Sequence, residues 1–362
     1  MLSPKTKRNI SRIIPFALIW LLYSIVYSLL ERGLLGDLTN YPSTGNPYHF
    51  STSIFSAAIS ALSLGLLIGT IEILYINKLF IKKSFLKKFI YKTSIYLGII
   101  ILFLLLNRVI YNSIELNTSV FTKLVWIRTG QFFFNYVFCG TVVYLTTVVG
   151  VSLFYNEISD NLGHGTLINF FTGKYHTPKE EERIFMFLDM KSSTTIAESL
   201  GHVQYFKMLR EYYFDLSDPI VKYSGEIYQY VGDEIIVSWK LKSVLENNNC
   251  IHCFFEMKEA LKKQTTKYNE KFGLLPEFKA GFHLGKVTTG EIGVIKREII
   301  FTGDVLNTTA RIQGLCNTYQ VDLLISGDLL NELDLTAQFQ FKSLGEKELK
   351  GRDEKIALYT LL

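Results

Sequence analysis

The chain has little cysteine: four residues among 362, at positions 139, 250, 253 and 316. Cysteines this few and this irregularly placed exclude a disulfide framework and favour a reducing compartment for the C-terminal half. Cys250 and Cys253 form a Cys-x-x-Cys pair around His252, but no second cysteine pair or histidine-rich segment accompanies them. We therefore interpret the pair as two half-buried helix positions rather than as a metal or redox site.

The sequence also has no internal repeat, no low-complexity tract and no block in which basic and aromatic residues alternate. Its formal net charge of +5 is modest for 362 residues, and much of it lies in short clusters beside apolar runs. A nucleic-acid groove needs concentrated positive charge interleaved with aromatic side chains. These absences argue against a nucleic acid as a partner.

Apolar residues are in excess, at 48% of the chain, and they are concentrated in the first 155 residues. Four apolar runs there are long enough to cross a bilayer: 13–30, 53–76, 90–110 and 132–155. The first run follows a basic start, as a signal peptide does, but it is long for one and lacks a clear cleavage site. We predict an N-terminal four-helix transmembrane domain over residues 1–155.

The connecting segments predict the orientation of these helices. The segment 78–88 holds five lysines, whereas the segments 31–51 and 111–130 carry few positive charges. Because positive charge gathers on the cytoplasmic side, we expect a multi-pass protein of the plasma (inner) membrane with its N-terminus and its C-terminal half in the cytoplasm. Within the runs, Gly65 and Gly69 can allow close helix contact, and Glu72 is expected to meet interfacial water near a membrane end.

A linker over residues 156–182, marked by glycines, Pro178 and a run of charges, is expected to lead into a second domain at 183–362. The predicted order there is strand, helix, hairpin, helix and strand, with an extension after it. This order indicates one mixed sheet covered by helices, the α+β ferredoxin-like (βαββαβ) plan. The expected bounds are 184–189 for the first strand, 193–223 for the first helix and 226–239 for the hairpin. They are 245–271 for the second helix, and 277–285 and 287–294 for the next two strands.

The first strand of this domain ends in Asp189. The residues after it are basic or carry hydroxyl groups: Lys191, Ser192, Ser193 and Thr194. They form a good helix start, and the free N–H groups of a helix start bind phosphate oxygens. A carboxylate in that place can bind a hard cation such as Mg²⁺, and such a cation can bind the phosphates of a polyphosphate.

A second carboxylate, Asp233, lies in a Gly-Asp turn between two predicted strands. If this hairpin neighbours the Asp189 strand in one sheet, the two aspartates lie side by side. Two carboxylates on adjacent strand ends are the arrangement of two-metal phosphoryl-transfer sites. The alternative is that Asp189 caps its helix and Asp233 is a plain turn residue.

Asn307 and Arg311 are four residues apart in a predicted helix, so they project from one face of it. An amide and a guanidinium on one face can bind ribose and phosphate oxygens together. The guanidinium also suits the charge on a five-coordinate phosphorus. Taken alone, the pair has a simpler interpretation as a solvated helix face.

Together these three segments resemble the class III nucleotide cyclases, the adenylate and guanylate cyclase catalytic domain, over about residues 183–362. The resemblance implies that Asp189, Asp233 and the Met190 backbone bind two Mg²⁺ or Mn²⁺ ions, and that Asn307 and Arg311 are the transition-state residues. It also implies a homodimer with shared active sites, in which one protomer supplies the aspartates and the other the Asn–Arg helix. A phosphate-binding cation is expected late in the chain, at Lys350 or Arg352.

Two positions depart from the family pattern. The base-contacting residue of the family lies four positions before the second metal-binding aspartate, and that position is Gln229 here. The position of its usual partner is occupied by Ile300. Gln229 can still hydrogen-bond a base edge, whereas Ile300 can only pack. Neither residue fits the adenine or the guanine pattern, so adenine comes first on family frequency alone.

The sequence thus predicts a membrane-bound nucleotide cyclase that makes a 3′,5′-cyclic nucleotide and pyrophosphate from a nucleoside triphosphate. Adenylate cyclase is the first expectation, and a guanylate or pyrimidine nucleotide cyclase is the alternative. A diguanylate-cyclase-like enzyme is a rival, because Gly-Asp-Glu-Ile at 232–235 superficially resembles its signature. The remaining rival is a non-catalytic membrane receptor that only binds nucleotide.

Overall fold

The structure, a computed structural model, describes residues 2–37, 39–40, 48–81, 83–241, 244, 247–333, 335, 339–349 and 355–361. It divides into two compact units. One is a helical unit, Thr6–Ile168, and the other holds Asn169–Leu362 together with Met1–Lys5. Lys350 and Arg352, the two predicted phosphate-binding cations, lie outside the described residues.

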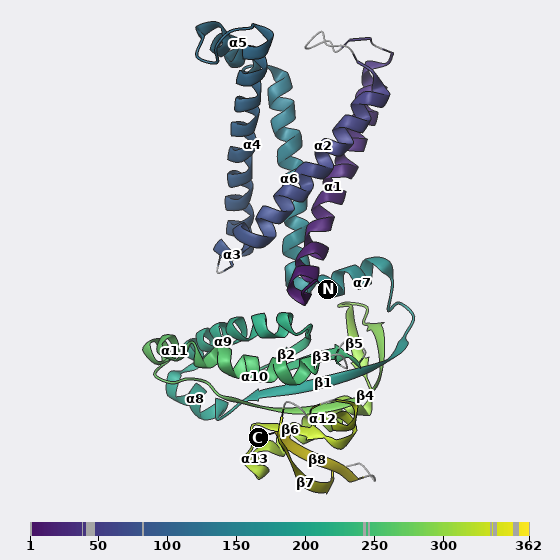
Figure 1. Cartoon of the computed structure of the whole chain (residues 1–362), viewed down its shortest axis with the longest axis vertical. Helices are drawn as coiled ribbons and strands as arrows, with labels where there is room; N and C mark the ends of the chain where they lie inside the picture. Colours follow the sequence, from purple (N-terminus) through teal and green to yellow (C-terminus); the bar gives the residue numbers. More distant parts are fainter. Residues whose placement is uncertain are drawn as a thin grey trace. The chain divides into compact units, whose positions relative to one another are not determined.

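The helical unit is built on long helices (Figure 1). Many of their large apolar side chains are exposed. Within the described residues, four helices are long and apolar enough to cross a membrane. They are α1 (Pro4–Leu35), α2 (Phe50–Ile71, continued to Leu79 by a π-helical turn and the short α3), α4 (Phe85–Glu115) and α6 (Tyr136–Leu162). Each overlaps one of the four apolar runs. The shorter helices are α3 (Asn77–Leu79), α5 (Lys123–Phe133) and α7 (His164–Thr172).

Two glycines of α2 bring this helix against α1. A Cβ atom added at Gly65 would lie 2.8 Å from the Ala17 Cα, and one added at Gly69 would lie 3.0 Å from the Phe16 Cβ. Only residues without a side chain allow two backbones to approach this closely. The predicted close contact at Gly65 and Gly69 is therefore present.

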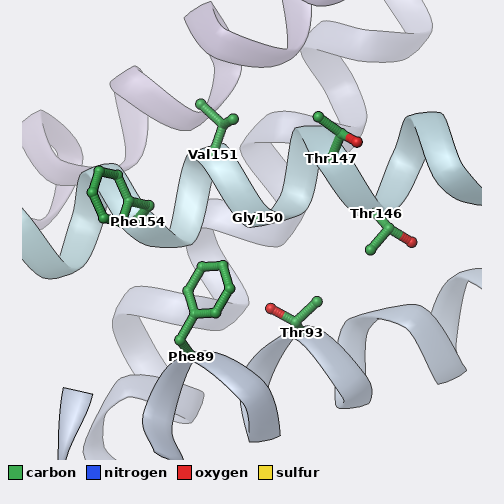
Figure 2. Close-up of a pocket in the computed structure, with 7 residues that line it drawn as sticks. All are labelled: Phe89, Thr93, Thr146, Thr147, Gly150, Val151 and Phe154. Carbon is green, nitrogen blue, oxygen red and sulfur yellow. The ribbon is translucent and has the colours of Figure 1, made fainter. Parts of the chain in front are cut away.

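Helices α4 and α6 border an apolar groove of about 380 Å³ (Figure 2). Phe89 and Thr93 of α4 face Gly150 of α6 across it, and the Thr93 hydroxyl is buried without a hydrogen-bond partner among the described residues. The remaining lining comes from α6: Thr146, Thr147, Val151 and Phe154. The groove lies within the helices that can cross a membrane, so its apolar lining suits hydrocarbon rather than water.

Glu72 differs from expectation. It is fully buried and pairs with Lys92, so it does not meet interfacial water. A π-helical turn, Glu72–Ile76, separates α2 from α3 at this point. The sequence pattern could not reveal the pairing, because the partner lies on a separate helix, α4.

The second unit contains one eight-stranded sheet in the order β2-β3-β1-β4-β6-β8-β7, with β5 paired to β4. Its first five strands are β1 (Lys179–Met190), β2 (Glu226–Val231), β3 (Glu234–Lys240), β4 (Phe278–Ile292) and β5 (Glu298–Thr302). The last three are β6 (Leu323–Ser326), β7 (Phe341–Glu348) and β8 (Lys355–Leu361). Along the order β2-β3-β1-β4 each strand is antiparallel to the next, whereas β6 pairs with β4 in parallel.

The two faces of β1 are covered by different helices (Figure 1). Ile184, Met186 and Leu188 join a core with α9 (His202–Lys222) and α10 (Asn249–Lys262). Phe185 and Phe187 instead contact α12 (Asp304–Gly314). Because side chains alternate along a strand, Asp189 belongs to the α12 face. The other helices are α8 (Ser193–Leu200), α11 (Thr265–Phe272), α13 (Cys316–Tyr319) and α14 (Gly327–Glu332).

Helix α12 lies directly on β4 because two glycines leave room for it. A Cβ at Gly281 would lie 2.4 Å from the backbone nitrogen of Gln313, and one at Gly285 would lie 2.9 Å from the Val305 Cβ. Four strand residues and eight helix residues both cover roughly 12–13 Å. The two glycines therefore match the two ends of α12.

Four expected elements differ in the structure, and one of them, the helix expected at 245–271, divides into α10 and α11. The helix expected at 193–223 divides into α8 and α9 at Gly201, whose φ of 72° interrupts the helix. The two strands expected at 277–294 form one long strand, β4. The segment 156–182, expected to be a linker, contains the end of α6, the whole of α7 and the start of β1. Cys250 and Cys253 are both buried in α10, more deeply than the half-buried positions expected.

Candidate active site

The two predicted aspartates meet at one end of the sheet. Asp189 is the second-last residue of β1, and Asp233 lies in the turn between β2 and β3. Antiparallel pairing of Leu188 with Ile235 brings the turn beside the end of β1. Burial and the negative charge of Asp233 raise the pKa of Asp189 above its ordinary value, an effect that Lys279 opposes.

Lys279 is a positive partner of Asp189, but no ion pair to Asp233 or Glu234 occurs among the described residues. The Oδ2 atom of Asp233 is buried and accepts no hydrogen bond from any described residue. Burial, together with Asp189 and Asp233, raises the pKa of Glu234 to about 7. Uncompensated negative charge of this kind is what a divalent cation relieves.

A residue of α9 holds in place the turn that contains Asp233. Gly232 has a φ of 63°, which favours glycine, and its carbonyl accepts a hydrogen bond from the Tyr213 hydroxyl. The Tyr213 ring also packs on Tyr230 of β2, with ring centroids 4.6 Å apart. The Gly-Asp turn was visible in the sequence, whereas its attachment to α9 was not.

Two residues that the sequence did not single out contact Asp189 directly. The Lys279 Nζ lies 3.3 Å from the Asp189 Oδ2 and donates a 2.9 Å hydrogen bond to Asn317. The Gln313 Nε2 donates to the same Asp189 oxygen over 3.2 Å. Lys279 is the cross-strand neighbour of Asp189 on β4, and Gln313 follows Arg311 by two residues. The register in which β1 pairs with β4 places Lys279 beside Asp189, and this register would have identified Lys279 as a site residue.

The predicted phosphate-binding segment follows Met190, the last residue of β1. Ser192 adopts a left-handed φ of 54°, and α8 begins at Ser193, next to the exposed Thr194. The Lys191 amide donates to the Glu277 carbonyl over 2.9 Å, and its ammonium pairs with Glu277 and Asp322. Both groups of Lys191 are therefore engaged within the protein.

Asn307 and Arg311 lie on the side of α12 away from the sheet. Asn307 is exposed and Arg311 is half-buried. Neither side chain makes a hydrogen bond or ion pair with a described residue, and the Arg311 Nη1 is buried without a partner. Helix α12 thus binds Asp189 of its own chain through Gln313. On its side away from the sheet it presents Asn307 and Arg311, whose side chains have no partner among the described residues.

The two predicted base-contact positions flank an aromatic contact. Gln229 is exposed on the edge strand β2, next to a bulge, and Ile300 is half-exposed on β5. Their neighbours, Tyr228 and Phe301, have ring centroids 4.8 Å apart, and the Phe301 amide donates to the Tyr228 hydroxyl. The Tyr228–Phe301 contact therefore joins β2 to β5.

No group of three or more His, Cys, Asp or Glu side chains that could hold a metal occurs in the described part of the chain. A cation at this end of the sheet would take two carboxylates, and its other ligands would be backbone or substrate oxygens. Mg²⁺ commonly binds proteins through one or two carboxylates plus substrate phosphates. The donor set therefore fits a metal that arrives with a polyphosphate.

Comparison with known proteins agrees with this chemistry. The family model of the adenylate and guanylate cyclase catalytic domain matches residues 176–362. Adenylate cyclase 2 of Rhizobium meliloti is 34% identical over 222 residues, which cover 61% of this chain and 61% of that protein. Adenylate cyclase of Anabaena cylindrica is 27% identical over 181 residues, which cover 48% of this chain and 35% of that protein.

Among solved structures, that of a bacterial light-regulated adenylyl cyclase is 22% identical with a TM-score of 0.44, and covers 51% of this chain and 91% of that one. The chain spans less than two thirds of the length of the curated relatives that it matches. The family model, however, covers more than half of the chain. The chain therefore belongs to the class III adenylate and guanylate cyclase family.

Proposed function

We propose that this chain is a membrane-bound class III cyclase that converts ATP to 3′,5′-cyclic AMP and pyrophosphate. The observation that carries the proposal is the meeting of Asp189 and Asp233 at the end of β1, where the Asp233 Oδ2 is buried without a donor among the described residues. The strand order β2-β3-β1-β4 supports a ferredoxin-like catalytic core. The two curated relatives are named adenylate cyclases, which supports ATP ahead of the other triphosphates.

Asp189, Asp233 and the Met190 backbone carbonyl would hold two Mg²⁺ or Mn²⁺ ions, which would lower the pKa of the ribose 3′-hydroxyl and neutralise the triphosphate. The 3′-oxygen attacks the α-phosphorus while the bond to the bridging oxygen breaks. Pyrophosphate leaves in line, and the hydroxyl proton passes to solvent. Gln313 and Lys279 fix the Asp189 carboxylate, because both bind its Oδ2.

Asn307 and Arg311 act on the substrate from a second copy of the chain. Asn307 orients the ribose, and Arg311 stabilises the charge on the α-phosphoryl group as it becomes five-coordinate. Their uncommitted side chains support this role. Exposed apolar side chains of α9 and β2 support a homodimer, because such side chains mark interfaces when they gather: Val203, Phe206, Phe214, Tyr230 and Val231.

The β- and γ-phosphates would bind at the start of α8, where the Ser193 and Thr194 amides and the Ser192 hydroxyl are available. Lys191 keeps this segment in position, since its amide and ammonium both bind the protein. Lys350 and Arg352 remain the proposed late cations. Gln229 would hydrogen-bond the base edge, and Ile300 would pack against the ring.

The helical unit would cross the plasma (inner) membrane four times, with the N-terminus and the catalytic domain in the cytoplasm. Four sufficiently long apolar helices support the spans. Contacts between Arg12 and Asp160, and between Lys88 and Glu157, gather the start of α1, the lysine-rich start of α4 and the end of α6 at one end of the unit. Positive charge at that end supports its cytoplasmic location.

The experiment uses the full chain in membrane vesicles with each of the four nucleoside triphosphates and Mn²⁺. Mass spectrometry identifies the products. We expect 3′,5′-cyclic AMP and pyrophosphate from ATP, and a loss of at least about 100-fold in turnover for Asp233→Asn, because a metal ligand is removed. A dinucleotide product, or no product from any triphosphate, would contradict the proposal.

A further inference from the structure

The helical unit contains a set of charged side chains among its apolar helices. This ionic cluster consists of three cations and three anions: Arg12, Glu72, Lys88, Lys92, Glu157 and Asp160. Lys92 pairs with Glu72 over 2.6 Å, Lys88 pairs with Glu157 over 2.6 Å, and Arg12 pairs with Asp160. The six formal charges cancel. Charges inside helices that can cross a membrane are costly and usually functional.

Lys92 is the centre of the ionic cluster. Its side chain is 3% exposed, and its Nζ donates 2.6 Å and 2.8 Å hydrogen bonds to the Glu72 Oε1 and the Asn77 Oδ1. The Glu157 Oε2 lies 4.0 Å away on α6. The second Glu72 oxygen accepts a 2.9 Å hydrogen bond from the Tyr96 hydroxyl. One ammonium thus joins α4 to residues on both sides of the π-turn and to α6.

The π-turn is what allows Lys92 to reach Glu72 and Asn77 together. Five residues of α-helix rotate by about 500°, so residues 72 and 77 would point about 140° apart. The Asn77 amide instead donates to the Glu72 carbonyl, the i→i+5 bond of a π-helix, which stacks the two residues. Relaxation of this turn to α-helix would withdraw Asn77 from Lys92. The contacts of Lys92 with both Glu72 and Asn77 therefore depend on the π-turn.

The ionic cluster also holds the last turns of α6. Glu157 and Asp160 bind Lys88 and Arg12, and the Asn77 Nδ2 donates to the Asp160 Oδ2 over 2.9 Å. The Arg12 Nε and Asn156 Nδ2 are buried without partners among the described residues, so the contact of α1 with α6 leaves two donors to satisfy. Helix α6 ends at Leu162, and the chain continues through α7 to β1, which carries Asp189.

We propose that the ionic cluster sets the turnover rate of the catalytic domain, an inference that rests on the proposed cyclase activity. Its paired state holds the end of α6 in the arrangement that supports activity. Loss of the Glu72–Lys92 pair leaves a buried charge without its nearest partner of opposite sign, and the surrounding apolar helices cannot solvate it. The π-turn and α6 then move to another arrangement, and turnover falls. The helical unit is by this account a regulator as well as an anchor.

The experiment compares Glu72→Gln with Glu115→Gln in the full chain in vesicles. Both variants remove one negative charge from an ion pair of the helical unit. The Glu115–Arg128 pair lies outside the ionic cluster, and its side chains are 48% and 42% exposed. Turnover is normalised to inserted dimer measured by size-exclusion chromatography. We expect a fall of at least fivefold for Glu72→Gln and a change within twofold for Glu115→Gln.

The charge-swapped double variant, Glu72→Lys with Lys92→Glu, tests whether pairing itself is responsible. We expect it to return turnover to within about threefold of wild type, and it decides the matter if Glu72→Gln does not accumulate. A Glu72→Gln protein as active as Glu115→Gln, or more active than wild type, would overturn the inference. So would a normally inserted swapped protein still reduced fivefold. A wild-type chain without cyclase activity would instead contradict the proposed function.

Discussion

Gln313 donates a 3.2 Å hydrogen bond to the Oδ2 of Asp189, so α12 is attached to an aspartate of its own chain. Asn307 and Arg311 project from the same helix without partners among the described residues. In a dimer with shared sites, α12 would therefore contact one active site through Gln313 and the other through Arg311. Because α12 is attached to Asp189, the positions of Gln313 and Arg311 depend on each other.

We expect Gln313→Leu to weaken Mn²⁺ binding. Loss of a group that orients a metal ligand typically costs 10- to 100-fold in metal affinity. Lys279 still holds Asp189 in this variant, so we expect the low end, about tenfold. Calorimetric titration of the full chain with Mn²⁺ measures the change, with Gln264→Leu, between α10 and α11, as the control. An unchanged affinity in a folded Gln313→Leu protein would show that the hydrogen bond does not orient the aspartate.

Asp322 predicts an acid-dependent loss of stability in the catalytic unit. Burial acts to raise its pKa, but hydrogen bonds from Lys191 and Lys258 outweigh burial and lower the pKa below the ordinary 3.8. Because the folded state favours the charged form, the stabilisation is present above pH 3.8 and is lost as the pH falls through the lowered pKa.

Asp322→Asn should therefore lower the free energy of unfolding at pH 7 by about 1 kcal/mol, the size expected for a partly exposed charge network. The difference from wild type should disappear as the pH falls below the lowered pKa of Asp322. Thermal unfolding at a series of pH values measures both effects, with the exposed Asp328→Asn as the control. A difference that persists unchanged in acid would rule out the charge as its cause.

Two glycines of the helical unit should respond oppositely to alanine. At Gly65 the new Cβ would lie 2.8 Å and 2.9 Å from backbone atoms of α1, which cannot move aside without separating the helices. We expect Gly65→Ala to cost about 1–3 kcal/mol, the usual cost of overpacking. At Gly150 the nearest atom is the tip of Phe89, 3.6 Å away, so Gly150→Ala should be neutral or slightly stabilising. Thermal unfolding in detergent compares the two, and equal midpoints would contradict the close α1–α2 contact.

The features that the sequence predicted are those coded locally. Apolar runs identified the four long helices, and a strand ending in Asp189 together with a Gly-Asp turn identified both aspartates. The features that it missed depend on tertiary contacts. Lys279 reaches Asp189 only through strand register, and Gln313 reaches it only because Gly281 lets α12 lie on the sheet. Glu72 was expected at a wet membrane end, but its partner is 20 residues away on another helix.

Complementation between two inactive variants tests the shared site most directly. Asp189→Ala and Arg311→Ala should each lower turnover by at least about 100-fold, because they remove a metal ligand and a transition-state cation. The two variants are co-expressed with different tags, and heterodimers are purified on both tags. A two-fold symmetric dimer has two equivalent sites, of which the heterodimer keeps one intact. We predict about half of the wild-type turnover per dimer, whereas verified heterodimers as inactive as their parents would contradict the account.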